Sequence, residues 1–284
     1  MYRLITGGAG FIGHNLWKRY GGYRVDDFSK GIFDCDEKLD CSSEYFTSWV
    51  KEHKPQHIIH LCGQSSGERS AEDPTNDFIR NVLTTQRLLS ACDYDVKSIT
   101  LASSMSVYGN NDHAKETDVP NPLSWYGLHK LHAEQLLEHY SLKHPSVICN
   151  SLRIYNCYGE NQDKNDMQQG MLSIYEAMAE KGEIVVKGSG DRIRNFIHVD
   201  DLVNGVMLAV NRLEGNPYEV INMGTGVPIT VKEIVESFGC PYRYTDPTPD
   251  DIDVCNADMS KAFSLLGYLA SHRVLSYISQ RLYH

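Results

Sequence analysis

The sequence predicts an α/β fold: a doubly wound parallel sheet with helices on both faces, followed by a smaller C-terminal lobe. Short apolar runs alternate with amphipathic segments over about the first 150 residues, and strand–helix alternation of this kind builds parallel sheets. A glycine cluster follows the first apolar run, where a strand turns into a helix. After Asn156 the alternation loosens, which indicates that the remaining residues build a different unit.

In the first half, the apolar runs are typical of buried strands and the segments between them of helices. The predicted strands are Arg3–Thr6, Tyr23–Val25, His57–Cys62, Ser98–Ala102 and Val147–Leu152. The predicted helices are Phe11–Tyr20, Ser43–His53, Pro74–Cys92 and Ser124–Lys143.

The second half predicts a helix over Gln168–Lys181, a strand over Ile184–Val186 and a turn over Gly188–Asp191. Another helix is expected to start at Asp200, because acidic residues suit a helix N-terminus. Thr245–Asp253 is rich in proline and aspartate and predicts a surface loop. We expect residues 1–156, with a strand and helix from about 194–222, to form the first domain, and residues 157–284 to form mainly the second lobe.

Composition excludes several classes of protein. The 284 residues include 37 acidic and 27 basic side chains, for a net charge of −10, which argues against general binding of nucleic acid or anionic membrane. No apolar stretch reaches the roughly 18 residues of a membrane span, and Met1–Thr6 lacks the features of a signal peptide. The eight cysteines are scattered without a C-x-x-C pair, which favours reduced thiols in a cytoplasm.

The glycine cluster predicts a nucleotide site. Gly7, Gly10 and Gly13 lie between a predicted strand and helix, where glycine lets a pyrophosphate approach the backbone and the helix N-terminus. Asp26 follows about 20 residues later, at the end of the second strand, where an acid accepts hydrogen bonds from the adenosine ribose. A carboxylate there would repel a 2′-phosphate, so the pattern favours NAD over NADP. The alternative is a plain glycine-rich turn and a solvated acid.

Tyr126 and Lys130 predict a catalytic pair. They lie four residues apart on a predicted helix, so both side chains project from one face. A free phenol is a poor base at neutral pH, but a nearby ammonium and a positive nicotinamide ring would lower its pKa. Lys130 would also hold the nicotinamide ribose. By itself such a pair is usually a solvated helix face, and the upstream glycines strengthen the catalytic interpretation.

At this point the sequence resembles the extended short-chain dehydrogenase/reductase family, and within it the nucleotide-sugar epimerases of the UDP-glucose/galactose 4-epimerase kind. The resemblance covers nearly the whole chain. It rests on Thr6–Gly13, His60–Gly63, Ser103–Gly109, Tyr126–Lys130, Leu152–Gly159, Arg194–Asp201 and Asn222–Gly226.

The resemblance implies a Rossmann NAD-binding domain, a smaller substrate-binding lobe and roles for further residues. Ser104 would complete the catalytic set by donating a hydrogen bond to the reacting sugar oxygen. Asn156 and Arg194 would hold the phosphates of the sugar nucleotide. The implied NAD contacts are Phe11, Ile12, Asp26, Asp40, Cys41, Leu61, Cys62, Gly63, Asn81, Ser103 and Tyr155.

The residues after Ser104 narrow the implied chemistry. Sugar 4,6-dehydratases of this family carry an Asp-Glu pair there, whereas this chain has Met105 and Ser106, which cannot act as general acid and base at neutral pH. We therefore expect 4-epimerisation, in which Tyr126 takes the hydroxyl proton while a hydride leaves and later returns to the other face of the ketone.

Two departures leave the substrate open. Many UDP-sugar epimerases have an arginine in the C-terminal loop, and Tyr244–Asp251 has none. Lys187 stands where an apolar residue often contacts the nucleotide base. Lys164 is either a second catalytic lysine, as in some ADP-heptose epimerases, or a solvated loop residue. A reductase or dehydrogenase on the same scaffold is the second enzyme hypothesis. An NAD-binding sensor is the third, and the intact Ser104, Tyr126 and Lys130 argue against it.

We expect a UDP-sugar as the most favoured substrate, a polysaccharide pathway and a homodimer. Family resemblance suggests a dimer through the predicted helices Pro74–Cys92 and Ser124–Lys143. Their apolar faces carry Phe78, Val82 and Leu89 on one helix and Leu131, Leu136 and Leu137 on the other. No metal site is expected, because His53, His57 and His60 lack a carboxylate at helical spacing.

Overall fold

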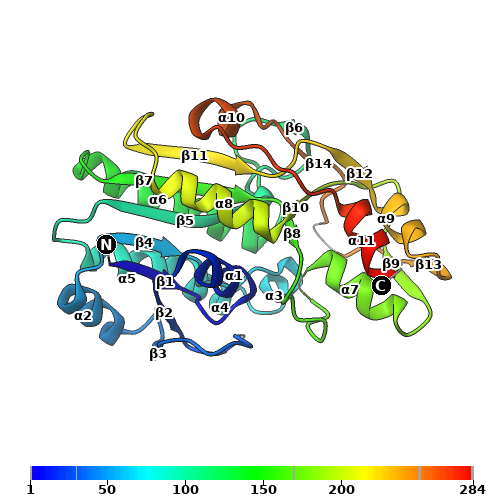
Figure 1. Cartoon of the computed structure of the whole chain (residues 1–284), viewed down its shortest axis with the longest axis horizontal. Helices are drawn as coiled ribbons and strands as arrows, with labels where there is room; N and C mark the ends of the chain where they lie inside the picture. The colour runs from blue at the N-terminus through cyan, green and yellow to red at the C-terminus, as the bar shows by residue number, and fades with distance from the viewer. Residues whose placement is uncertain (1, 30, 169, 249–250, 283–284) are drawn as a thin grey trace.

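The computed structural model describes residues 2–29, 31–168, 170–248 and 251–282. A seven-stranded parallel sheet, ordered β11-β7-β5-β4-β1-β2-β3, forms its centre (Figure 1). Its strands are β1 (Arg3–Thr6), β2 (Tyr23–Asp26), β3 (Glu37–Lys38), β4 (His57–His60), β5 (Ser98–Ser104), β7 (Ile148–Ile154) and β11 (Tyr218–Met223).

Alternating side chains bury both faces of this sheet. On β1, Leu4 packs into the core on one face and Ile5 into the core on the other, and Ile58 and Ile59 of β4 do the same. Helices α2 (Glu44–His53), α5 (Thr84–Ala91) and α6 (Trp125–Lys143) cover the first face. Helices α1 (Phe11–Tyr20), α8 (Val199–Val210) and α10 (Ser260–Leu266) cover the second. The predicted doubly wound α/β fold is therefore confirmed.

Most predicted strands and helices of the first half end within about two residues of the expected bounds. The predicted helix Pro74–Cys92 differs, because it consists of α4 (Pro74–Phe78), a π-helical turn η1 (Ile79–Leu83) and α5. The hydroxyls of Thr84 and Thr85 donate to the carbonyls of Arg80 and Asn81 at 2.7 and 2.9 Å, and such side-chain bonds compete with α-helical ones. A short helix, α3 (Gly67–Glu72), precedes them and was not predicted.

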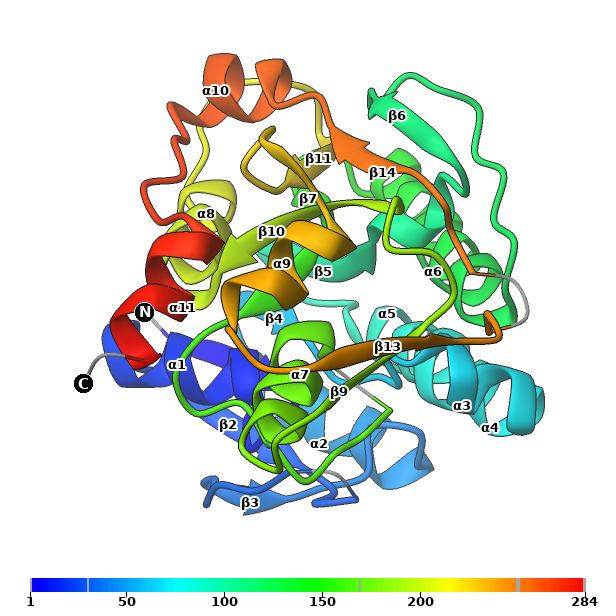
Figure 2. The ribbon, with the colours of Figure 1, turned by 90° about the vertical axis from the view of Figure 1, so that its right-hand side faces the viewer.

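The second lobe, which faces the viewer in Figure 2, is built mainly by the later part of the chain. It has its own apolar core. One small sheet joins β8 (Asn156–Tyr158), β10 (Ile193–His198) and β12 (Pro228–Thr230). Two strand pairs join β9 (Ile184–Lys187) to β13 (Tyr242–Thr245), and β6 (Asn111–Ala114) to β14 (Cys255–Ala257). The remaining elements are a short 3₁₀ turn, η2 (Met105–Val107), and the helices α7 (Met171–Ala179), α9 (Val231–Ser237) and α11 (Val274–Leu282).

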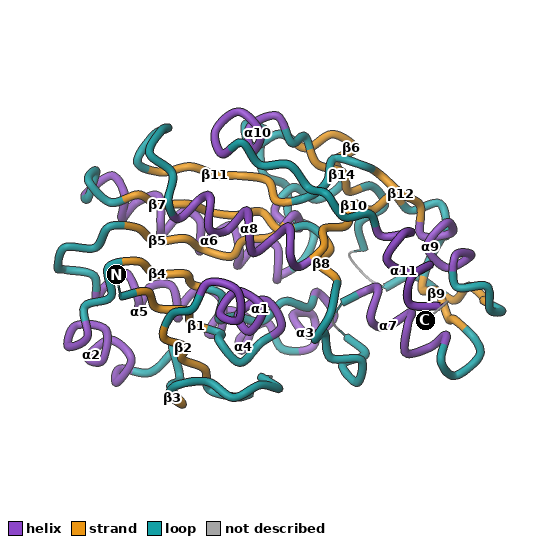
Figure 3. The backbone as a smooth tube through the Cα atoms, viewed as in Figure 1, coloured by secondary structure: helices purple, strands orange, loops and turns teal. Residues whose placement is uncertain are grey.

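The predicted helix Gln168–Lys181 is shorter in the structure, where α7 begins at Met171. Gly170, just before it, has a φ of +82°, a left-handed conformation that suits glycine and interrupts the helix. Figure 3 shows the sheet strands stacked one above another, with the second lobe at their carboxyl ends. In the described part of the chain, no helix combines the length and apolar character needed to cross a membrane.

Candidate active site

A cavity of about 830 Å³ opens at the carboxyl ends of the central strands. It is lined by Gly7 after β1, Gly63 after β4, Ser104 at the end of β5 and Tyr155 after β7. The strand order reverses between β1 and β4, and open α/β sheets bind their ligands at such a point. Residues of α7, β9 and β10 extend the cavity into the second lobe.

The glycine loop forms one end of this cavity. Gly7 has a φ of +70°, and a Cβ atom there would lie 2.8 Å from the backbone nitrogen of Cys62. A Cβ atom on Gly13 would collide with the carbonyl oxygen of Gly7, so the tight packing of the loop requires glycine. The helix α1 begins at Phe11, and first-turn N–H groups lack intrahelical partners, so this end fits a pyrophosphate.

Asp26 borders the same end of the cavity at the end of β2. Its Oδ2 accepts a hydrogen bond from Ala9 N at 3.0 Å, and its Oδ1 accepts one from Phe28 N at 2.8 Å. Burial raises the pKa of the Asp26 carboxyl, and these two hydrogen bonds oppose the rise. Because a carboxylate oxygen accepts more than one hydrogen bond, Asp26 retains acceptor capacity for ribose hydroxyls. The residues at this end therefore fit NAD.

Most other residues predicted to contact NAD also line the cavity, namely Gly10, Phe11, Ile12, Asp40, Cys41, Leu61, Cys62, Gly63, Ser103 and Tyr155. Asn81 instead lies behind Gly63, with its Oδ1 2.6 Å from where a Cβ atom of that glycine would be. The Nδ2 of Asn81 donates to Asp77 at 3.0 Å, while its buried Oδ1 has no hydrogen-bond partner among the described residues. An acceptor is thus available beside the cofactor end.

Ser104, Tyr126 and Lys130 all line the cavity, and Tyr126 is hydrogen-bonded with Ser104. Ser104 ends β5, and Tyr126 and Lys130 lie one turn apart at the start of α6. The ammonium of Lys130 donates to the carbonyl of Ala102 at 2.9 Å and lies 5.8 Å from the centre of the Tyr126 ring. All three side chains are buried. The spacing on α6 predicted that Tyr126 and Lys130 would share a face, and they do.

Burial controls the protonation of this pair. It raises the pKa of Tyr126 to about 12, although a hydrogen bond with Ser104 opposes the rise. It lowers the pKa of Lys130 to about 8, although Asp77 opposes the fall. The expected lowering of the phenol pKa is therefore not a property of the protein alone, and would need the positive charge of a bound oxidised cofactor.

Residues that the sequence did not single out hold the start of α6 in place. Ser70 of α3 accepts a hydrogen bond from Tyr126 N at 3.1 Å. His129 pairs with the buried Asp77 at 2.6 Å, and Asp77 also accepts from Gln64 at 2.8 Å. These contacts join segments far apart in the chain, so no local spacing pattern could have identified them.

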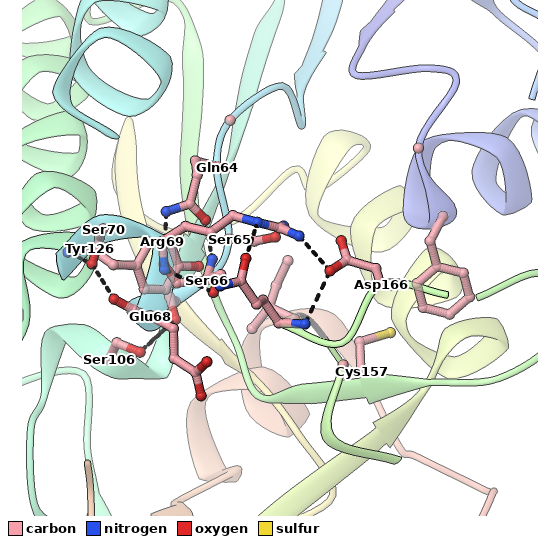
Figure 4. Close-up of a pocket in the computed structure, with 18 of the residues that line it drawn as sticks. Gln64, Ser65, Ser66, Glu68, Arg69, Ser70, Ser106, Tyr126, Cys157 and Asp166 are labelled. Atoms are coloured by element: carbon pink, nitrogen blue, oxygen red, sulfur yellow. Dashed lines mark hydrogen bonds and ion pairs between the residues drawn. The ribbon is translucent and has the colours of Figure 1, made fainter. Parts of the chain in front are cut away.

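The helix α3 also contacts the second lobe across the cavity (Figure 4). Arg69 forms an ion pair with Asp166 and donates to Gln168 at 2.9 Å. Glu68 pairs with Lys187 of β9 at 2.6 Å. The same short helix thus bonds to both the start of α6 and the lobe that closes the other end of the cavity. The ammonium of Lys187 forms an ion pair with Glu68. The sequence analysis had instead noted Lys187 at a position that often contacts the nucleotide base.

Arg194 and Asn156, predicted to bind phosphate, line the second-lobe end of the cavity. The Nδ2 of Asn156 donates to the carbonyl of Asn195 at 2.8 Å. Arg192 lines the same end, and both arginines pair with Asp251. Two arginines bridged by one carboxylate therefore line this end.

Lys164 does not line the cavity; its ammonium pairs with Glu180 at 2.5 Å and Glu176 at 3.7 Å, which favours the interpretation as a loop residue.

Within the described ranges, one group of side chains has ligand atoms close enough for a metal, His198, Asp200 and His272. The two imidazole rings stack with centroids 4.3 Å apart, an arrangement of packed rings. The predicted absence of a metal among His53, His57 and His60 stays a prediction.

Comparisons with known proteins agree with this geometry. A family model described as the NAD dependent epimerase/dehydratase family matches residues 3–224. The UDP-glucose 4-epimerase of Mycolicibacterium smegmatis is 30% identical, over 94% of this chain and 93% of the relative.

Two solved structures are similar over the whole chain. The UDP-glucose 4-epimerase of Thermus thermophilus, in complex with NAD, has a TM-score of 0.88 and 27% identity, and the match covers 100% of this chain and 98% of that one. The UDP-glucose 4-epimerase of Thermotoga maritima, with UDP-glucose, has a TM-score of 0.86 and 28% identity, covering 99% and 100%.

Proposed function

Because the chain belongs to the NAD dependent epimerase/dehydratase family, we propose that it inverts C4 of a nucleotide sugar, with Tyr126, Lys130 and Ser104 as its catalytic residues. The observation that carries this proposal is that these three side chains line one cavity together with the glycine loop and two arginines. Residues 1–156, with about 194–222, would hold NAD, and residues 157–284 mainly the substrate.

The glycine loop and Asp26 would hold NAD, as would the residues that follow β3, β4 and β7. When bound, this cofactor supplies a hydride acceptor that returns the same hydride, so the reaction consumes no cofactor. The phenolate of Tyr126 takes the proton of the C4 hydroxyl and later returns it to the ketone oxygen. Lys130 stabilises that phenolate, and the hydroxyl of Ser104 donates a hydrogen bond to the sugar oxygen. Met105 and Ser106 offer no carboxyl group for eliminating water.

A UDP-sugar is the substrate class best supported, since relatives similar over nearly the whole chain are named UDP-glucose 4-epimerases. We propose that its phosphates contact Arg194 and Asn156, which line the second-lobe end of the cavity. The eight cysteines are free thiols, which fits a reducing compartment, and we propose the cytoplasm, where a polysaccharide pathway would draw on the product. We also propose a homodimer.

The test uses UDP-glucose carrying deuterium at C4, incubated with the NAD-loaded protein and followed by NMR. We expect UDP-galactose to form with its label retained, because the transferred hydrogen never exchanges with water. No net change in NADH absorbance should accompany turnover. A stoichiometric absorbance change would instead favour the reductase or dehydrogenase hypothesis. Loss of the label to solvent would contradict the C4 ketone mechanism. If UDP-glucose is inert, a panel of GDP-, dTDP-, CDP- and ADP-sugars tests the nucleotide separately from the chemistry.

A further inference from the structure

Two of the eight cysteines, Cys41 and Cys62, lie together at the glycine-loop end of the cavity. Cys41 follows β3 and Cys62 follows β4, and both side chains line the cavity. The thiol of Cys41 donates a hydrogen bond to the sulfur of Cys62. Cys41 is 4% exposed, whereas Cys62 is half-buried, and both are free thiols. The cavity wall therefore carries two adjacent thiols.

The groups that contact Cys62 favour its thiolate. The hydrogen bond from Cys41 lowers the pKa of Cys62 well below its usual value, whereas burial opposes the fall. His60 adds to the fall, and its Nδ1 lies 3.8 Å from Sγ of Cys62. The same hydrogen bond raises the pKa of Cys41. Cys62 is therefore the more acidic thiol of the pair, and a thiolate is the form of cysteine that reacts with oxidants.

Charged side chains near the pair also distinguish its two members. The ammonium of Lys130 and the guanidinium of Arg80 interact with the charge of Cys62 and stabilise its thiolate. The acidic residues Asp26–Asp27 add to the rise in the pKa of Cys41. The first of these two carboxylates also acts against a charge at Cys62. A negative charge is thus better stabilised at Cys62 than at Cys41, which makes Cys62 the sulfur that attacks an oxidant.

We propose that Cys41 and Cys62 are an oxidation site, where a peroxide forms a reversible disulfide that weakens NAD binding and from which bound NAD shields both thiols. The proposal rests on the placement of NAD at the glycine-loop end and on no property of the sugar substrate. It gives a chemical role to two residues for which the family resemblance implied cofactor contact alone. Disulfides of proteins in reducing compartments are usually transient and redox-sensing, as this one would be.

The reaction consumes one peroxide and oxidises two thiols. With hydrogen peroxide, the thiolate of Cys62 attacks one oxygen, the O–O bond breaks, and hydroxide leaves and takes a proton to form water. Cys62 is then a sulfenic acid. Cys41 attacks the sulfur of Cys62, the S–O bond breaks as the S–S bond forms, and the leaving hydroxide takes the proton of Cys41 to form a second water. Because the sulfenic acid is neutral, Cys62 no longer opposes ionisation of Cys41.

A disulfide would change the part of the cavity that fits NAD. Cys41 directly follows Asp40, a predicted NAD contact. Gly7 of the glycine loop packs on the backbone of Cys62, where an added Cβ atom would lie 2.8 Å from the Cys62 nitrogen. A disulfide brings its two sulfur atoms to about 2.0 Å, well inside contact distance. The segments after β3 and β4 therefore have to move towards each other, and the glycine loop with them.

Other cysteines do not offer the same combination. Cys157 also lines the cavity, but burial raises the pKa of its thiol. Cys92 and Cys149 belong to the core on one face of the sheet, away from the cavity, and burial raises the pKa of each to about 12. These thiols stay protonated at neutral pH, so we expect them to resist oxidation.

The experiment treats the full chain with hydrogen peroxide, with and without saturating NAD, then alkylates the remaining thiols and maps peptides without reduction. We expect a peptide pair linked through Cys41 and Cys62 to form in the NAD-free protein and to disappear after dithiothreitol. NAD at 100 times its dissociation constant should slow this reaction by about 100-fold, because only the free protein reacts. Absence of the linked pair, or its formation at the same rate with NAD, would overturn the inference.

Serine variants test the roles of the two sulfur atoms. Cys41→Ser leaves Cys62 to form a sulfenic acid, which dimedone traps, whereas Cys62→Ser should give no adduct at Cys41. The matched control is Cys240→Ser, at a half-buried cysteine outside the cavity, which should link Cys41 to Cys62 as the wild type does. An adduct at Cys41 instead of Cys62 would overturn the assignment. Each variant is checked for an unchanged thermal midpoint, and should a serine variant fail to fold, the peptide map of the wild type carries the test.

The affinity of the oxidised protein for NAD completes the test. We expect oxidation to raise the dissociation constant of NAD by about 5- to 150-fold, the usual range of coupling between two sites, and dithiothreitol to restore it. An unchanged constant would overturn the link between the disulfide and the cofactor. None of these measurements uses a nucleotide sugar. A protein that forms the disulfide but epimerises nothing supports the inference and contradicts the proposed function, whereas one that epimerises without forming it overturns the inference alone.

Discussion

Tyr126 and Lys130, the proposed catalytic pair, show how burial changes the protonation of two neighbouring side chains. The phenol holds its proton more tightly than a free tyrosine and the ammonium holds its proton less tightly than a free lysine. At neutral pH the pair is therefore a neutral phenol beside an ammonium. A positive charge arriving nearby lowers both pKa values, so an oxidised cofactor would favour the phenolate that the reaction needs.

Tyr126→Phe removes only the phenolic oxygen. We expect epimerisation to fall by about 10²- to 10⁴-fold, the usual contribution of a general base, with NAD affinity unchanged. The matched control is Tyr140→Phe on the same helix, whose hydroxyl donates to Cys92 and lies outside the cavity. Steady-state rates and NAD titration provide the measurement. A loss of less than about tenfold would mean that another group takes the proton.

Lys130→Met should be at least as damaging as Tyr126→Phe, because it removes the charge beside the phenol and a predicted ribose contact. Ser104→Ala should cost less, since one hydrogen bond is worth roughly 1–3 kcal/mol, or about 5- to 150-fold in rate. Comparing kcat for the two variants checks this order. The reverse order would assign the main role to Ser104.

Asp26 should make the protein prefer NAD to NADP. Its carboxylate borders the cavity beside the glycine loop, and it would face a 2′-phosphate with like charge. We expect Asp26→Ala to bring the dissociation constants of NAD and NADP closer together, as measured by fluorescence titration. Asp95→Ala, an exposed acid paired with Lys97, serves as control. Equal affinity of the wild type for both dinucleotides would show that Asp26 does not face the ribose.

At the scale of elements, the spacing of apolar residues predicted the helices and strands with a long repeating pattern and missed the short helices and strands. Apolar positions in the sequence predicted five strands of the sheet and three of its helices, namely β1, β2, β4, β5, β7, α1, α2 and α6. The two-residue strand β3 and the short helix α3 are too brief for any period, and α3 is held by contacts with Asp166 and Lys187 far along the chain. Tyr126 and Lys130 could be predicted because both lie on one helix, whereas Ser70, Asp77 and Arg192 depend on tertiary contacts.

Asp201, in the first turn of α8, anchors the segment that leads into α11. Its Oδ2 accepts from the backbone N–H groups of Ser271 and His272, both at 2.9 Å, and its Oδ1 accepts from Ser271 Oγ at 2.9 Å. Burial alone would raise the pKa of this carboxyl, but the hydrogen bonds from His272 and Ser271 lower it overall. The charged form is therefore the one that stabilises the folded chain.

We expect Asp201→Asn to lower the free energy of unfolding at neutral pH by about 1–3 kcal/mol, because a buried charged acceptor is lost. A carboxyl whose pKa is lowered by folding stabilises above its unfolded pKa, near 3.8, and this contribution is lost as pH falls through the folded pKa. The difference between wild type and variant should thus shrink below about pH 4. Urea unfolding at pH 7 and below pH 4 measures it. A difference independent of pH would assign the effect to packing.

At the scale of the whole molecule, α3 joins the two lobes across the cavity, through Arg69 with Asp166 and Glu68 with Lys187. The two partners of each ion pair lie roughly a hundred positions apart in the chain, so the pattern of a single segment could not predict these contacts. Composition and motifs predicted that a second lobe exists. Its own core, and the small sheets around β10, come from apolar and hydrogen-bonding partners distributed over the whole second half.

The predicted dimer faces are only partly available on the surface. Val82 and Leu137 are buried in the core of their own chain, at 7% and 0% exposure, because these helices also cover the sheet. Phe78 of α4 and Trp125 of α6 remain 43% and 49% exposed, and both rings pack against His129. An aromatic patch shared by the two helices is thus what a second copy would cover, together with the half-buried Leu131 and Leu136.

The last prediction follows from this patch. We expect a homodimer at micromolar concentration in sedimentation, with Phe78→Glu shifting it to monomer, since a charge on a buried apolar interface is left unpaired. Leu213→Glu, which changes an exposed leucine after α8, should leave the dimer intact. A wild type that sediments as a monomer would contradict the dimer. A dimer that persists in Phe78→Glu would instead move the interface to another face of the molecule. Because a stable interface of standard size buries about 1,600 Å² in total, the patch can form only its centre, and α4, η1 and α6 must supply the surrounding contacts.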